Sequence, residues 1–482
     1  MAAITGKQYI ERIDQLKTNV WIDGEQVTGK ISEHPAFKGV MKSQAALYDL
    51  QHEMAVKDDL TYPSPLTGDK VGLSFLQPKK QEDLTKRRLM VQQWAKLTNG
   101  LMGRSPDYMN TVLTALVCST DYLNGKENCF PENLKAFYEM AREQDLSLTH
   151  TFINPQVNRS KVYFEDTDEP IAAKIIDRTK EGILIKGAKL LATQGGMTDE
   201  IIVISSGWMV SEGDAYAFAI PSNSEGLKFI CRESFVGGES VFNYPLSARF
   251  EEMDCIVVFD NVLVPWNRIF YYDNLEVANN FMNVCAFKSF SLHQVASRQI
   301  IKTEFILGLV ESIANTINIT EYQHVQEKIS EIIIALETMK ALVLKSEIEA
   351  KLDDWGYLRP DRTTLQVAIN VFPRIYPRFT DIIQLLGASG LMAIPTEKAF
   401  SSTIRNDLDQ YLQAKAEDAE NRVKLFRLAW DLTMSSFGTR QTLYERFFFG
   451  DPVKISSELY FTYDKEIFVQ RVKDLLDQSP PT

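Results

Sequence analysis

Cysteine is scarce in this sequence: there are five in 482 residues, at Cys118, Cys129, Cys231, Cys255 and Cys285. The number is odd, the residues are widely spread, and their spacing does not match that of metal ligands. A disulfide-stabilised secreted scaffold and a zinc module are therefore not expected, and we predict no metal site. Reduced thiols in a cytoplasmic protein are the simplest interpretation.

Long apolar runs and an excess of positive charge are also absent. No stretch of 18 apolar residues occurs, which predicts no membrane span. Residues 1–17 are polar and amphipathic and lack the apolar region of a signal peptide. Lys and Arg number 52 against 64 Asp and Glu, a net charge of −12, which argues against nucleic acid or an anionic membrane surface as the main partner. We expect a cytoplasmic protein.

The hydrophobic pattern divides the chain into three blocks, residues 1–147, 148–273 and 274–482. The first block is predicted to be mainly helical, with a small hairpin at 20–27 that turns at Asp23-Gly24. The second block contains short apolar runs separated by turn residues, which is typical of a barrel or a sandwich. Its predicted strands cover 172–177, 182–188, 200–205, 215–221, 227–231 and 254–259.

The third block is again helical. Val325, Ile329, Ile332, Leu336 and Met339 recur at steps of three and four and form one helical stripe. Long helices with one apolar stripe each favour an antiparallel bundle. The long predicted helices cover 278–315, 417–436 and 365–386, the last interrupted by Pro373 and Pro377; those of the first block cover 42–54, 81–101, 106–119 and 131–144.

Two short stretches concentrate groups that can hold a ligand. His150–Arg159 lies where the helical pattern gives way to strands, and it carries an imidazole, an aromatic ring, side-chain amides and a guanidinium. Such groups position a polar heterocycle or an anion. They could equally cap backbone ends in a connecting segment.

The second stretch is 103–108. Ser105 can cap a helix that begins at Pro106, which would place Arg104 and Tyr108 at the positive end of the helix dipole. This pair suits an oxyanion or a phenol, although plain capping with a solvated Arg104 gives the same pattern.

Six motifs resemble the 4-hydroxyphenylacetate 3-hydroxylase family, and Bacillus-type members in particular, in the same order along nearly the whole chain. They are Gly-Arg-Ser-Pro-Asp-Tyr (103–108), His-Thr-Phe-Ile-Asn-Pro-Gln-Val-Asn-Arg (150–159), Gly-Ala-Lys-Leu-Leu-Ala-Thr (187–193), Arg-Phe-Glu-Glu-Met-Asp (249–254), Phe-Asp-Asn-Val-Leu-Val-Pro-Trp (259–266) and Phe-Phe-Gly-Asp-Pro (448–452). The resemblance implies an α+β multidomain, acyl-CoA-dehydrogenase-like fold. Its parts would be an N-terminal helical domain, a central β-barrel and a C-terminal four-helix bundle, assembled as a tetramer or a dimer.

The resemblance also implies the oxygenase component of a two-component monooxygenase. A separate reductase would supply FADH2, which is held non-covalently and reacts with O2, and 4-hydroxyphenylacetate or a similar phenol would be hydroxylated ortho to its hydroxyl. Arg104, Tyr108 and His150 would surround that hydroxyl as catalytic residues. The cofactor-binding positions would be His150, Thr151, Phe152, Gln156, Val157, Asn158, Arg159, Thr193, Gly450, Asp451, Pro452 and Val453.

The choice of phenol is left open by the sequence. By resemblance the substrate carboxylate would meet Ser205 and Ser206, and a pair of hydroxyls can bind a carboxylate. Ser-Ser is also an ordinary way for a strand to end. We interpret Glu251 and Glu252 as charges on the surface of the β block.

Two other functions are compatible with a chain of this kind. A flavin-dependent lyase related to 4-hydroxybutyryl-CoA dehydratase would need an iron–sulfur cluster, with cysteines near Arg104 and Tyr108 and another seven residues after the bundle histidine. The first region has no cysteine, and the residue seven after His293 is Ile300. A non-catalytic flavin-binding relative would not need Arg104, Tyr108 and His150, and their retention argues against it.

Overall fold

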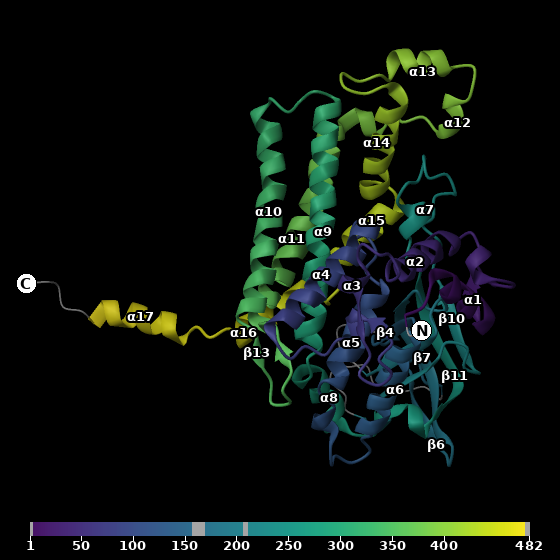
Figure 1. Cartoon of the computed structure of the whole chain (residues 1–482), viewed down its shortest axis with the longest axis vertical. Helices are drawn as coiled ribbons and strands as arrows, with labels where there is room; N and C mark the ends of the chain where they lie inside the picture. Colours follow the sequence, from purple (N-terminus) through teal and green to yellow (C-terminus); the bar gives the residue numbers. More distant parts are fainter. Residues whose placement is uncertain (1–2, 157–168, 206–210, 478–482) are drawn as a thin grey trace, which may run out of the picture.

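The computed structural model describes residues 3–156, 169–205 and 211–477. Figure 1 shows the strands of the larger sheet gathered in the lower right of the view and the long C-terminal helices in the upper part. The N-terminal part is mainly helical, as predicted. Its helices are α1 (Gly6–Leu16), α2 (Lys38–Leu50), α3 (Lys57–Leu60), α4 (Gln81–Thr98), α5 (Pro106–Val117) and α6 (Pro131–Gln144), with a small ribbon of β3 (Thr61–Pro63) and β4 (Lys70–Gly72).

The predicted hairpin is confirmed as β1 (Val20–Ile22) and β2 (Glu25–Gln26). Asp23 and Gly24 both have positive φ, at 53° and 82°, which is the backbone that a two-residue hairpin turn requires. The hairpin is part of the larger β-sheet, because Val20 and Trp21 of β1 pair in parallel with β10. The first block therefore contributes two strands to the central sheet.

The central part contains two sheets. The larger has the order β2-β1-β10-β11-β7-β6 and the smaller the order β12-β9-β8-β5. The strands are β5 (Leu148–Thr151), β6 (Lys174–Arg178), β7 (Gly182–Thr193), β8 (Glu200–Ile204), β9 (Tyr216–Pro221), β10 (Leu227–Cys231), β11 (Asp254–Pro265) and β12 (Ile269–Tyr272), with a short helix α7 (Ser247–Phe250) before β11.

The predicted strands are confirmed, but the closed barrel is not what forms. Among the described residues each sheet keeps two edges, β2 and β6 in one and β12 and β5 in the other, so the arrangement is the sandwich alternative. The added β1–β2 hairpin occupies one flank of the larger sheet. The division of the chain into domains at 147 and 273 remains a prediction.

The C-terminal part places α9, α10 and α11 side by side as long helices, with α14 and α15 continuing the helical layer (Figure 1). The helices are α8 (Leu275–Val284), α9 (Phe287–Thr316), α10 (Gln323–Ile348), α11 (Arg362–Gly387), α12 (Glu397–Phe400), α13 (Arg405–Tyr411), α14 (Ala419–Thr433), α15 (Ser436–Phe447), α16 (Pro452–Thr462) and α17 (Glu466–Asp477), with a small ribbon of β13 (Lys351–Leu352) and β14 (Leu358–Arg359). None of the helices in residues 3–156, 169–205 and 211–477 is both long and apolar enough to cross a membrane.

Two details of the bundle differ from the prediction. The helix predicted at 278–315 is two helices, α8 and α9, which meet at Cys285 and Ala286. By contrast, α11 is continuous where the prediction has an interruption, at Pro373 and Pro377. Each proline removes one backbone N–H, but the face carrying Phe372, Tyr376 and Phe379 is buried against the core, and this packing holds the helix together.

Candidate active site

The N-terminus of α5 brings the first predicted site residues together. Pro106 is the first helical residue, as expected, but the hydroxyl of Ser105 does not cap a backbone N–H. It donates instead to Oδ1 of Asp107, at 2.5 Å. The Asp107 carboxylate is fully buried and also accepts a hydrogen bond from Nε2 of Gln294, at 2.9 Å. The first turn is therefore fixed by side chains, with Tyr108 buried on it.

The guanidinium of Arg104 lies against two aromatic rings that also contact each other. Its Cζ is 4.4 Å from the ring centre of Tyr108 and 4.5 Å from that of Phe448, which comes from the segment after α15. Nη1 donates to the hydroxyl of Tyr444 at 2.8 Å. Nε is buried and has no hydrogen-bond partner among the described residues. Arg104 is thus a fixed cation in the wall of the site.

His150 is the second-last residue of β5, and its ring is surrounded by other rings. The ring centres of Tyr108 and Phe152 lie 6.0 and 4.3 Å from that of His150. Burial first, and the Arg104 cation second, lower the pKa of His150 well below its usual range, so the imidazole is neutral at pH 7. Its Nδ1 is buried without a partner in the described part of the chain.

The segment after β5 is held to β7 by hydrogen bonds. Nζ of the buried Lys189 donates to the carbonyl of Phe152 at 3.3 Å and to Oδ1 of Asn154 at 2.8 Å. The N–H of Leu190 donates to the carbonyl of Ile153, at 2.7 Å. These bonds fix the position of the Phe152 ring at the wall of the site.

Thr193, at the end of β7, belongs to a buried charged cluster. Its hydroxyl donates to Oδ1 of Asp254 at 2.8 Å. Arg440 of α15 donates to both carboxylate oxygens of Asp254, at 2.7 and 2.9 Å, and Nε of Arg232 donates at 3.1 Å. Burial alone would raise the pKa of Asp254, but Arg440 and Arg232 lower it well below its usual range.

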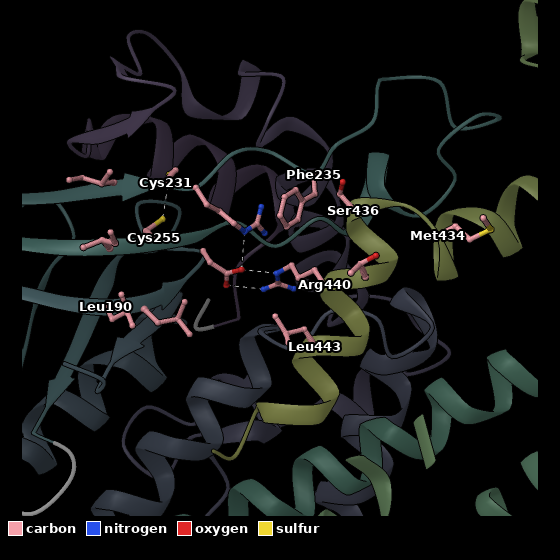
Figure 2. Close-up of a pocket in the computed structure, with 14 residues that line it drawn as sticks. Leu190, Cys231, Phe235, Cys255, Met434, Ser436, Arg440 and Leu443 are labelled. Carbon is pink, nitrogen blue, oxygen red and sulfur yellow. Dashed lines mark hydrogen bonds and ion pairs between the residues drawn. The ribbon is translucent and has the colours of Figure 1, made fainter. Parts of the chain in front are cut away.

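These groups line one cavity of about 500 Å³, which lies between the sheets, α5 and α15. Its walls include Arg104, Tyr108, His150, Phe152, Thr193 and Gly450, together with Tyr444 and the rings of Phe447, Phe448 and Phe449. A second, largely apolar cavity of about 660 Å³ shares Leu191, Asp254, Arg440 and Leu443 with the first and is drawn in Figure 2. The space suits a planar aromatic guest beside a larger group.

The other predicted cofactor-binding positions that the structure describes do not line either cavity. Thr151 is buried, and its hydroxyl has no partner among the described residues, whereas Gln156 is exposed. The carboxylate of Asp451 caps α16 by accepting the backbone N–H groups of Val453 and Lys454, Pro452 is the first residue of that helix, and Val453 is exposed. Val157, Asn158, Arg159 and Ser206 lie outside the described residues.

Ser205 is placed differently from the expectation. It is buried, and its hydroxyl is used by the backbone: it donates to the carbonyl of Asp214 and accepts the N–H of Tyr216, at 3.1 Å. It is not among the residues that line either cavity. A role for Ser205 toward a carboxylate therefore stays a prediction.

The interpretation of Glu251 and Glu252 as surface charges is wrong, since both are 1% exposed. Glu252 accepts hydrogen bonds from the backbone N–H groups of Gly103 and Arg104, and Glu251 accepts one from Arg232, at 2.6 Å. Their charges are tolerated because each carboxylate has donors. Sequence reasoning also missed Tyr444 and Arg440, which stand in no recognised motif.

Comparison with known families decides which family the chain belongs to. The model described as "4-hydroxyphenylacetate 3-hydroxylase N terminal" matches residues 5–271, and the one described as "4-hydroxyphenylacetate 3-hydroxylase C terminal" matches residues 278–477. The chain belongs to the 4-hydroxyphenylacetate 3-hydroxylase family. The family membership that the six motifs predict is confirmed.

Relatives match over nearly the full length. A Bacillus subtilis protein named "Probable 4-hydroxyphenylacetate 3-monooxygenase" is 58% identical over 477 residues, covering 99% of each chain. The oxygenase component of 4-hydroxyphenylacetate 3-monooxygenase from Geobacillus is 47% identical, covering 99% of this chain and 97% of that one.

Solved structures agree. The crystal structure of an oxygenase component (HpaB) of 4-hydroxyphenylacetate 3-monooxygenase, complexed with FAD and 4-hydroxyphenylacetate, superposes with a TM-score of 0.94 at 44% identity, covering 98% of each chain. An archaeal 4-hydroxybutyryl-CoA dehydratase superposes with a TM-score of 0.88 at 20% identity, over 99% of this chain and 96% of that one, and shows the shared fold alone. These matches confirm the multidomain α+β, acyl-CoA-dehydrogenase-like architecture.

Proposed function

We propose that this protein is the oxygenase component of a two-component, FADH2-dependent monooxygenase that hydroxylates 4-hydroxyphenylacetate ortho to its hydroxyl. The observation that carries the proposal is the convergence of Arg104, Tyr108 and His150 on one aromatic-walled cavity in a chain of this family. The structural relative with FAD and 4-hydroxyphenylacetate bound, at 44% identity over 98% of the chain, supports the cofactor and the substrate class.

Arg104 is suited to hold the phenol oxygen. The guanidinium is fixed by its contacts with the rings and with Tyr444, and as part of the cavity wall it can donate to a developing phenolate. A fixed cation makes the phenol more acidic, and a phenolate ring is more reactive at the ortho carbon. The aromatic walls exclude the water that would screen this charge.

His150 and Tyr108 complete the hydrogen bonding around that oxygen. The neutral imidazole can accept a hydrogen bond from the phenol hydroxyl. Burial raises the pKa of Tyr108, against the lowering by Arg104 and Arg298, so its hydroxyl stays protonated and can donate. We assign to His150 the acceptance of a hydrogen bond from the phenol, and to Tyr108 the donation of a hydrogen bond to the phenol oxygen.

The cavity also fits a flavin ring system. Besides the groups assigned to the phenol, its walls include Phe152, Thr193 and Gly450. When bound, reduced FAD supplies the activated oxygen. The contacts assigned to Gln156, Val157, Asn158, Arg159, Asp451, Pro452 and Val453 are part of the proposal.

The partners follow from this scheme. A separate flavin reductase would deliver FADH2, either through solution or in a transient complex, and O2 and the phenol would be the other substrates. We further propose assembly as a homotetramer or a dimer, and a cytoplasmic location. The net charge of −12 gives no reason to expect nucleic acid as a partner.

A coupled assay tests the function. Purified protein is mixed with a generic flavin reductase, NADH, FAD and a panel of 4-substituted phenols, and products are scored by mass for addition of one oxygen atom. We expect a catechol from 4-hydroxyphenylacetate only when both proteins are present. No catechol from any phenol would refute the proposal, and stoichiometric iron and sulfide in the purified protein would favour a dehydratase-type lyase instead.

A further inference from the structure

Two of the five cysteines face each other across neighbouring strands. Cys231 ends β10 and Cys255 is the second residue of β11, and they are direct partners in the antiparallel register. Their Sγ atoms are 3.4 Å apart (Figure 2). Both thiols are free and buried. The sequence separates them by 23 residues, so only the strand register reveals the pair.

The backbone around this pair has the geometry that a disulfide needs. The N–H of Arg232 donates to the carbonyl of Asp254, at 3.1 Å, which makes Cys231 and Cys255 a non-hydrogen-bonded pair of the ladder. The Cα atoms of such pairs are about 4.5 Å apart and their side chains point the same way. That distance lies within the roughly 4.4–6.8 Å range that disulfides span. Small side-chain rotations would bring the sulfurs into bonding distance.

A small oxidant can reach the pair. Both cysteines belong to the wall of the 660 Å³ cavity, which also borders the candidate active site through Asp254 and Arg440 (Figure 2). Cys231 is 9% exposed and Cys255 is 1% exposed. The hydrogen bond from its neighbour, and then burial, raise the pKa of the Cys255 thiol. Cys231 is therefore the sulfur that an oxidant meets first.

We infer that Cys231 and Cys255 are a redox-sensitive modification site, which hydrogen peroxide converts to a reversible intrachain disulfide with loss of oxygenase activity. In the first step the Cys231 sulfur attacks one peroxide oxygen. The O–O bond breaks, a sulfenic acid forms, and the thiol proton leaves with the other oxygen as water. In the second step the Cys255 sulfur attacks the sulfenic sulfur, the S–O bond breaks, and a second water carries away the Cys255 proton. Two thiols are oxidised and one peroxide is reduced to two waters.

The neighbours of the two cysteines connect the pair to the active site. Asp254 precedes Cys255 and Arg232 follows Cys231, and these two side chains form an ion pair at 3.1 Å. Asp254 is also the group that holds Thr193 and Arg440. Forming the bond would still shift the backbone beside this carboxylate, because disulfides most often span Cα distances of about 5.5–6 Å. Hydrogen bonds of 2.7–2.9 Å tolerate little displacement.

The test compares the wild-type protein with C231S, C255S and, as the matched control, C129S. Cys129 is only partly buried and lies in another region of the chain. After treatment with hydrogen peroxide, we expect wild-type and C129S to lose two hydrogens in intact mass. Digestion should yield a linked peptide containing Cys231 and Cys255, and dithiothreitol should restore the original mass. C231S and C255S should give no such peptide.

Activity is measured on the same samples in the coupled assay. Wild-type and C129S should lose activity several-fold on oxidation and regain it with dithiothreitol, whereas C231S, which lacks the attacking sulfur, should keep its activity on oxidation. Separate oxygen additions at either cysteine, with no linked peptide, would overturn the modification site. A linked peptide with unchanged activity would overturn its connection to the active site. Because the mass measurement needs no catalysis, it stands even if the proposed function fails.

Discussion

The carboxylate of Glu252 accepts hydrogen bonds from the backbone N–H groups of both Gly103, at 2.8 Å, and Arg104, at 2.6 Å. Glu252 lies just before β11, about 150 residues away in the sequence, and is fully buried. The loop that carries Arg104 is therefore positioned by the β-sheet part of the molecule. It is this contact that joins the helical N-terminal part to the candidate site.

Replacing Glu252 with Gln tests that contact. Gln keeps one acceptor oxygen but places an NH2 group against one of the two backbone N–H groups, which would leave a buried donor unpaired. Such a loss costs about 1–3 kcal/mol, so we expect kcat/KM for the phenol to fall about tenfold. Steady-state kinetics in the coupled assay measure it, with exposed Glu233→Gln as the control. Unchanged kinetics in E252Q would remove the positioning role.

Tyr444→Phe tests the other contact of Arg104. The variant keeps the ring that stacks on Phe448, at 4.8 Å between centres, but removes the hydroxyl that accepts from Arg104. The guanidinium then loses the side-chain acceptor that it has among the described residues, and we expect kcat to fall about fivefold to fiftyfold with little change in FAD affinity.

Exposed Tyr460→Phe, on α16, is the matched control for this variant and should behave as wild-type. Because a positioning role acts through Arg104, Y444F should add little further loss in an Arg104→Ala background. Full additivity of the two substitutions would contradict the assigned role.

The sequence predicts the parts of the site that lie in continuous motifs. Arg104, Tyr108 and His150 can be identified from the sequence because each belongs to a family motif of six or more consecutive residues. All three line the same cavity. The helix start at Pro106 was also predictable, since proline favours the first turn. The hydroxyl of Ser105 was not, because its choice of Asp107 over the backbone depends on burial from distant segments.

The missed residues share one property, which is that their partners are far away in the sequence. Tyr444 and Arg440 come from α15, and nothing near them indicates contact with α5 or β11. A glutamate is ordinarily a surface residue, and Glu252 is tolerated in the interior because backbone N–H groups and Gln194 donate to its carboxylate. The continuity of α11 through Pro373 likewise depends on tertiary packing, which local propensity does not contain.

The low pKa of His150 predicts a pH dependence of stability. In the folded protein the imidazole binds a proton only well below pH 6.5, whereas in the unfolded chain it titrates near about 6.5. Between these values the unfolded state binds more protons. The free energy of unfolding should therefore fall as pH decreases from about 6.5, by at most about 1.4 kcal/mol per pH unit from this group.

Urea denaturation of wild-type and His150→Gln at pH 7.5, 6.5 and 5.5 measures this contribution. The stability difference between the two proteins should shift in favour of H150Q as the pH falls. His324→Gln, at an exposed position on α10, should show no such shift. A difference that is constant with pH would show that burial does not lower the pKa of His150.

Arg104→Lys separates the charge of Arg104 from its shape. Lysine keeps the cation but loses the planar group that lies against Tyr108 and Phe448 and reaches Tyr444. Since the proposed role needs a donor fixed at the phenol oxygen, we expect kcat to fall by about 10²–10³, as when one preorganised donor is lost, while FAD binding is retained. The matched control is Arg405→Lys, where an arginine also stacks on a ring, Phe400, in the α12–α13 region, and where activity should not change. Catechol formation by R104K at the wild-type rate would mean that charge alone suffices, and the stacked geometry would then have no part in catalysis.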